Sequence, residues 1–142
     1  MTTSSRAYNA TRILLCIFRF QGNNLVSKAL ISKQEKLSAA YIGQILVQLR
    51  GAGLVYGVRG VNGGYRIMKD SSEITLLDIL QITEGNTDVI GDVPRGCRCS
   101  EPCLKCLWDG AGKTLRDYFC GITLKQLHDE YAEKHLPLNY II

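Results

Sequence analysis

The stretch from Ser38 to Met68 constrains the fold of this chain more than any other, because a helical repeat there runs directly into two short strands. Ser38 is placed to cap the helix. Apolar residues recur behind it at spacings of three and four, which predicts one buried face: Ile42, Ile45, Leu46 and Leu49. The opposite face carries uncharged polar side chains: Ser38, Tyr41, Gln44 and Gln48. Such side chains read base edges in a major groove, although a merely solvated face has the same composition.

A glycine-rich hairpin follows this helix. Residues 54–58 and 65–68 are predicted strands, and residues 59–64, Arg-Gly-Val-Asn-Gly-Gly, form the tip. Arg59 and Arg66 flank the tip, and Asn62 lies within it. Glycine removes bulk and arginine supplies charge, so the hairpin is typical of a wing that approaches a phosphate backbone or a minor groove. The glycines lack the spacing of a nucleotide-binding loop.

Charge is distributed unevenly between the two halves of the chain. Residues 1–70 hold ten Lys and Arg against two acidic residues, a net charge of +8, whereas residues 71–142 have a net charge of −4. The basic half also contains two predicted helices, over residues 7–20 and 25–33. This asymmetry favours a nucleic acid as partner over a surface that is only solvated. We expect Lys28, Lys33 and Lys36 to contact phosphates together with the two wing arginines.

The second half of the chain predicts three further segments. Thr75 and Asp78 form a capping pattern for a helix that ends near Thr83, and residues 85–105 are predicted to be a loop. A long helix starts near Cys106, with an apolar stripe that suits a partner helix: Trp108, Ala111, Leu115 and Tyr118. A last helix begins after Thr123 and ends before Pro137.

These elements predict a mostly α-helical fold with a small β-hairpin wing, in which a winged helix-turn-helix is joined to a long C-terminal dimerisation helix. We divide it into a DNA-binding domain (1–84), a cysteine-rich loop (85–106) and the dimerisation and C-terminal helices (107–142). No apolar run is long enough to span a membrane, and the polar start, Met1 to Ser5, differs from a secretion signal. We therefore expect a cytoplasmic protein.

Four of the six cysteines fall within ten residues: Cys97, Cys99, Cys103 and Cys106. In a cytoplasmic chain such crowding indicates metal or redox chemistry rather than disulfide bonds. Iron–sulfur clusters use thiolate ligands, usually four, and nearby Arg95, Arg98 and Lys105 would favour the thiolate form. Zinc is the alternative metal, although all-cysteine zinc sites are usually less cramped. Reactive thiols without a metal are the third possibility. Cys16 and Cys120 are expected to pack, and His128 and His135 to be exposed.

The order of these segments resembles the IscR/NsrR family of bacterial winged-helix regulators, the Rrf-two family. The matching stretches are residues 38–55, 58–65, 74–80 and 122–127, together with the cysteine block that precedes Leu107-Trp108. The resemblance covers about residues 6 to 130. It implies a homodimer that binds a near-palindromic operator in double-stranded DNA. It also implies a sensing loop in which three cysteines and a variable fourth ligand hold one 2Fe–2S or 4Fe–4S cluster per subunit.

The chain departs from those relatives at two places. Their cysteines are spaced by five residues each, whereas here the loop is shorter, and Cys106 falls where IscR-like members have a histidine ligand. Some NsrR-like members take an acidic ligand from the first helix, but the matching residue here is Ala7. The resemblance therefore implies an all-cysteine site in each subunit. Position 43 is glycine where IscR-like relatives carry glutamate, so their operator preference does not transfer.

Together these features predict a DNA-binding transcriptional repressor that senses iron–sulfur, redox or nitric-oxide status. Ser38, Tyr41 and Gln44 would read bases. The chain shows no paired acids and no nucleophile with a base, so we expect no enzymatic activity. Two alternatives remain: a winged-helix regulator whose cysteines bind zinc or act as redox thiols, and an adaptor that has kept the fold but lost DNA binding.

Overall fold

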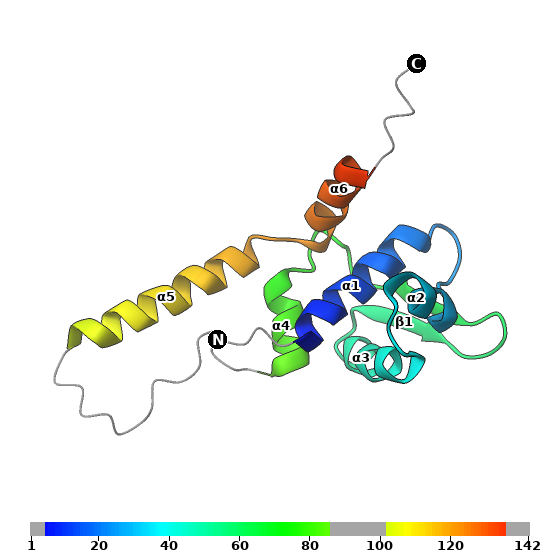
Figure 1. The fold of residues 1–142 in the computed structure, drawn as a ribbon, viewed down its shortest axis with the longest axis horizontal. Helices are drawn as coiled ribbons and strands as arrows, with labels where there is room; N and C mark the ends of the chain where they lie inside the picture. The colour runs from blue at the N-terminus through cyan, green and yellow to red at the C-terminus, as the bar shows by residue number, and fades with distance from the viewer. Residues whose placement is uncertain (1–4, 86–101, 136–142) are drawn as a thin grey trace, which may run out of the picture.

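The computed structural model describes residues 5–85 and 102–135. Figure 1 shows a helical head from which one long helix, α5, extends. The elements in chain order are α1 (Ser5–Phe20), α2 (Lys28–Glu35), α3 (Ala39–Gly51), β1 (Val55–Val58), β2 (Gly64–Ile67), α4 (Leu76–Glu84), α5 (Pro102–Cys120) and α6 (Leu124–His135). The predicted fold class, mostly α-helical with a β-hairpin wing, is confirmed. No helix in the described ranges combines the length and apolar character needed to cross a bilayer.

The core of the head is built around α1, which contacts α2, α3, α4, α6 and β2. The buried face of α1 explains this position, because Ala7, Ala10, Ile13, Leu14, Cys16 and Ile17 recur at helical spacing and must be covered by neighbouring elements. The largest fully buried side chains come from many parts of the head: Ile13, Leu14, Ile17, Val26, Ile31, Ile42, Ile45, Leu46, Leu49, Ile74, Ile79 and Leu124.

The helices α2 and α3 form the helix-turn-helix. Each begins at a serine cap: the Ser27 side chain accepts a hydrogen bond from the Leu30 amide, and that of Ser38 accepts one from the Tyr41 amide. The cap predicted at Ser38 is therefore confirmed. Lys36 ends α2 with φ 55°, a left-handed conformation that turns the chain sharply into α3.

The wing is an antiparallel hairpin in which Val55 pairs with Ile67 and Val58 with Gly64. On the other edge of β2, Val26 exchanges two backbone hydrogen bonds of 2.8 Å with Tyr65. The approach is so close that a Cβ at position 64 would lie 2.8 Å from the Val26 carbonyl oxygen. Gly64 is therefore required to fasten the base of the wing to the segment before α2.

The starts of α4 and α6 lie side by side. Both have the capping boxes that the sequence predicts, Thr75 with Asp78 and Thr123 with Gln126. Backbone hydrogen bonds join the two segments, from the Leu124 amide to the Ile74 carbonyl (2.8 Å) and from the Leu76 amide to the Ile122 carbonyl (3.0 Å). Because Leu124 is fully buried, α6 shares the core of the head rather than forming a separate unit.

Four sequence expectations differ from the structure. The second helix spans Lys28–Glu35 rather than residues 25–33, because the Ser27 side chain caps its first turn. The long helix begins at Pro102 rather than near Cys106, because proline suits the first helical position, where its missing N–H costs nothing. His128 is half-buried rather than exposed, because its ring packs edge-on against Phe18 at 4.6 Å. Cys120 is exposed and does not pack within the described part of the chain. The division at residues 84 and 106 stays a prediction.

Candidate nucleic-acid interface and cysteine site

The solvent side of α3 is the first candidate surface. We call Ala40, Gly43, Gln44 and Val47 the outer face of α3, because these positions lie opposite the buried stripe. Gln44 is the one predicted base reader that lies on it, and it is exposed. Tyr41 and Gln48 lie at its edge, partly buried. Ala40 and Val47 are also exposed on this face, and small apolar side chains can contact thymine methyl groups.

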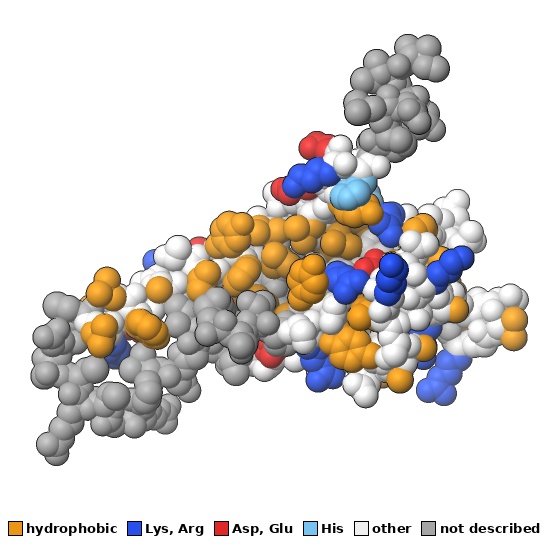
Figure 2. All heavy atoms as spheres, viewed as in Figure 1, with side chains coloured by type: hydrophobic (Ala, Val, Ile, Leu, Met, Phe, Trp, Pro, Cys, Tyr) orange, Lys and Arg blue, Asp and Glu red, His pale blue; other side chains and the backbone are white. Residues whose placement is uncertain are grey.

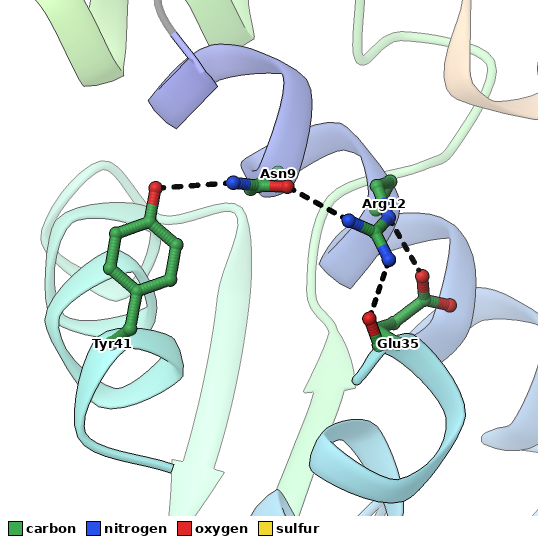
Figure 3. Close-up of polar contacts among 4 residues, drawn as sticks. All are labelled: Asn9, Arg12, Glu35 and Tyr41. Carbon is green, nitrogen blue, oxygen red and sulfur yellow. Dashed lines mark hydrogen bonds and ion pairs between the residues drawn. The ribbon is translucent and has the colours of Figure 1, made fainter. Parts of the chain in front are cut away.

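A chain of polar contacts explains why Tyr41 is partly buried (Figure 3). The Tyr41 hydroxyl accepts a hydrogen bond of 3.3 Å from the Asn9 amide nitrogen, and the Asn9 side-chain oxygen accepts one of 3.0 Å from Arg12. The Arg12 Nε lies 3.0 Å from a carboxylate oxygen of Glu35, and the same guanidinium donates to the Glu35 carbonyl. We call Asn9, Arg12, Glu35 and Tyr41 the corner network.

The corner network fastens both arms of the helix-turn-helix to α1, since Glu35 ends α2 and Tyr41 lies in the first turn of α3. The Arg12 and Glu35 side chains are only 33% and 16% exposed, so the ion pair is partly shielded from water. This ion pair thus holds the end of α2 against α1. The sequence carries no local signal of this network, because its members are up to 32 residues apart.

Replacing Arg12 by methionine should lower the free energy of unfolding by about 1–3 kcal/mol, because Glu35 and Asn9 would lose a charged donor at a partly buried site. Chemical denaturation of wild type and Arg12→Met measures this directly. Arg59→Met, which removes an exposed arginine from the wing, is the matched control and should change stability by less than about 0.5 kcal/mol. Equal loss in both variants would show that the corner network contributes nothing.

The wing presents its polar residues at and beside its tip. Arg59, Asn62 and Arg66 are all exposed, and Val61 between them is fully exposed. Gly63 permits the tight turn, because a Cβ there would lie 2.2 Å from the Val58 carbonyl oxygen. The tip is thus a narrow backbone loop with arginines on both sides, of a size that fits a groove.

The three lysines expected to contact phosphates lie along α2. Lys28 is its first residue, Lys33 lies in its last turn and Lys36 caps its end, and all three are exposed. In Figure 2, Lys and Arg side chains are spread over the head that carries the helix-turn-helix and the wing. The exposed lysines of α2 and arginines of the wing therefore place positive charge on the two elements that precede and follow α3 in the chain.

The cysteine site is described only in part. Cys97 and Cys99 lie outside the described residues, and for Cys103 the backbone is described but the side chain is not. Cys106 lies in α5 and is exposed. It follows Leu104 and precedes Trp108 by two residues each, which places it on the opposite side of the helix from them. Among the side chains that the structure does describe, no three His, Cys, Asp or Glu residues converge.

Cys16 is a buried thiol in the core of the head, with 1% of its surface exposed. Burial, with a smaller contribution from nearby Glu35, raises its pKa from 9.0 to about 11. The interpretation of Cys16 as a packing residue agrees with this position.

Cys16 should therefore be the slowest cysteine to react with a thiol reagent in the folded, metal-free protein. At neutral pH the raised pKa alone lowers its thiolate fraction about 100-fold, and burial adds to the protection. Timed alkylation followed by peptide mass spectrometry measures the rates, with exposed Cys120 as the internal comparison. Comparable rates for the two thiols in the folded protein would contradict the buried position of Cys16.

The apolar stripe of α5 remains uncovered. Trp108, Ala111 and Tyr118 are exposed, and Leu115 is partly buried. Leu104 and Leu107 extend the stripe toward the helix start and are also exposed, at 48% and 69%. Figure 1 shows the N-terminal half of α5 standing clear of the head. Figure 2 shows hydrophobic side chains continuing from α5 onto the head. Such a contiguous apolar surface is typical of a protein–protein interface.

The chain is similar to known proteins in both sequence and fold. The chain matches a family described as Rrf2, iron-dependent transcriptional regulator, over residues 3–130. It is 31% identical to the HTH-type transcriptional regulator IscR of Vibrio cholerae, over 89% of this chain and 75% of that protein. The global cysteine regulator CymR of B. subtilis superposes with a TM-score of 0.80 at 25% identity, covering 92% of this chain and 98% of CymR. IscR of T. potens gives a TM-score of 0.77 at 25% identity, covering 95% and 91%.

The family and these relatives are transcription regulators rather than enzymes, and the winged helix-turn-helix found here is the DNA-binding architecture that such regulators use. The family match covers nearly the whole chain, including α5 and most of the described part of α6. The chain therefore belongs to the Rrf2 family of transcription regulators.

Proposed function

We propose that this regulator is a homodimeric, cytoplasmic repressor whose affinity for a near-palindromic operator depends on an iron–sulfur cluster held by its cysteine loop. The observation that carries the proposal is the chain order: four cysteines within ten residues run from the connection after the DNA-binding head into the start of α5, the helix with the exposed apolar stripe. Any change in that segment acts on the connection between the DNA-reading unit and the dimer contact.

The DNA contacts follow from the exposed polar groups of the head. The proposal places α3 in the major groove, where Gln44 contacts bases from the outer face. Ser38 and Tyr41 would contact bases from its edge, with hydroxyl oxygens that already accept hydrogen bonds within the chain. Arg59, Asn62 and Arg66 of the wing, with Lys33 and Lys36, would contact phosphates and the adjacent minor groove.

The dimer contact is the stripe of α5. Trp108, Ala111, Leu115 and Tyr118 would pack against the same helix of a second copy, extended by Leu104 and Leu107. Burying these side chains removes apolar surface from water at roughly 25 cal/mol per Å². Cys106 lies on the other side of α5, so this packing leaves its thiol accessible.

The donor chemistry of the loop fits an iron–sulfur cluster. Four thiols can supply the usual ligand set, Cys97, Cys99, Cys103 and Cys106, with the exposed Cys106 as the described member. When bound, the cluster supplies a centre that oxidants or nitric oxide can alter. Two of the four ligands, Cys97 and Cys99, belong to the connection that follows α4, and the other two belong to the start of α5. Ligand release would free that connection and change the spacing of the two heads.

A second candidate is a regulator whose cysteines bind zinc or act as redox thiols without a cluster. It is favoured by two neighbours in fold, since B. subtilis CymR is named a global cysteine regulator and the CymR of Staphylococcus aureus is known in an oxidised form. Metal content separates the two candidates.

Anaerobic purification followed by quantification of iron, sulfide and zinc tests the proposal. We expect iron and sulfide in equal amounts, and selection of a two-fold symmetric site from a pool of random duplexes. Zinc, or no metal after anaerobic reconstitution, would favour the second candidate. Failure to select any sequence would overturn DNA-binding regulation itself.

A further inference from the structure

Gly43 leaves room for a lysine from another helix on the outer face of α3. Position 43 points away from the core, yet it is partly covered. A Cβ built there would lie 3.5 Å from the ammonium nitrogen of Lys28, and no other atom of a described residue outside its own helix turn comes as near. The side chain missing at position 43 is thus replaced on the surface by the end of Lys28.

Lys28 reaches this position because it is the first residue of α2, which packs against α3. Its side chain is exposed, and within the described ranges it forms no ion pair with an acidic residue. The ammonium group is therefore available to a ligand, and it lies beside position 43 on the outer face of α3.

We infer that Lys28 is a specificity-determining residue that donates to a guanine in each operator half-site, rather than a phosphate contact. This inference rests on the proposed function, since it requires α3 to enter the major groove. Guanine presents O6 and N7 as paired acceptors there, and a lysine ammonium is a suitable donor to both. Gly43 allows this contact with guanine because it leaves space on α3 for a donor that belongs to α2.

The two roles of a lysine predict different results. A phosphate contact weakens binding to all sequences alike and lowers the salt dependence, whereas a base contact changes which base is preferred. The experiment therefore measures preference at each position of the selected site and not affinity alone.

The test uses the full chain and a site selected by the wild type from random duplexes. Lys28→Met should reduce the preference for guanine at one position of each half-site by roughly 5- to 150-fold. Lys33→Met is the matched control, because Lys33 is an exposed lysine of the same helix. It should weaken all duplexes equally and leave base preference unchanged.

Substitutions at position 43 test the same idea with Lys28 intact. Gly43→Glu places a carboxylate beside the ammonium and should remove the same guanine preference by pairing with it. Gly43→Ala adds only a methyl group at ordinary contact distance and should keep the preference. Circular dichroism and thermal unfolding of each variant show whether it is folded.

Each outcome decides one of the two proposals. A wild type that selects no sequence overturns the proposed function and this inference with it. A wild type that selects a site without a guanine preference, or a Lys28→Met variant that keeps it, overturns the inference alone. Uniform weakening by Lys28→Met, as for Lys33→Met, would assign Lys28 to a phosphate.

Discussion

Raising the salt concentration from roughly 50 to 200 mM should weaken operator binding by about 10³-fold or more. The reason is the number of cationic side chains that surround the reading surface. Lys33, Lys36, Arg59 and Arg66 are exposed on each head, and a dimer presents each of them twice. Six or more phosphate contacts release as many counterions, and each contributes about 0.9 to the slope of log affinity against log salt.

Fluorescence anisotropy with the selected duplex at four or more salt concentrations measures that slope. Arg59→Met removes two contacts from a dimer and should make the slope shallower by about 1.8. Lys134→Met is the matched control, because Lys134 is exposed in the last turn of α6, away from the helix-turn-helix. A flat salt response of the wild type would rule out phosphate contacts by the head.

Replacing any one loop cysteine by alanine should abolish the iron–sulfur cluster, which is the second large effect. The reason is the ligand count, since Cys97, Cys99, Cys103 and Cys106 provide no more thiolates than such a cluster uses. The measurement is the iron and sulfide content of anaerobically purified protein, together with its broad visible absorption near ~400 nm. Loss of both signals is expected in all four variants.

Cys120→Ala is the control for the cysteine variants. Cys120 is also exposed but is the last residue of α5, outside the proposed ligand set. It should keep full iron and sulfide content. A Cys106→Ala variant with an intact cluster would show that the fourth ligand comes from elsewhere, and zinc in place of iron would support the alternative site.

Local patterns in the sequence predict the starts of α3, α4 and α6. The stripe behind Ser38 and the two capping boxes depend on residues within a few positions of one another, so their signals survive without knowledge of the fold. The start of α5 was misplaced for an equally local reason. Pro102 was interpreted as part of a loop, although proline is also well suited to begin a helix.

Contacts between distant segments could not be predicted from local patterns in the sequence. Tyr41 lies at the edge of the outer face of α3 because its hydroxyl meets Asn9 of α1, a contact across 32 residues. The end of Lys28 lies beside position 43 of α3, where glycine presents no side chain. Helical periodicity predicts which side of α3 is buried, but not which side chains of neighbouring helices lie against its other side. From the sequence, the DNA contacts of Tyr41 and Lys28 are therefore predicted by residue type alone.

The central claim is that the cysteine site controls DNA binding, and one comparison tests it most directly. Operator affinity is measured on a single anaerobic preparation before and after its metal is removed by a chelator, at constant salt. The account predicts a change in dissociation constant of about 5- to 150-fold, the usual range of coupling between two sites. The same affinity in both states would contradict it, because the loop would then not act on the DNA-binding head.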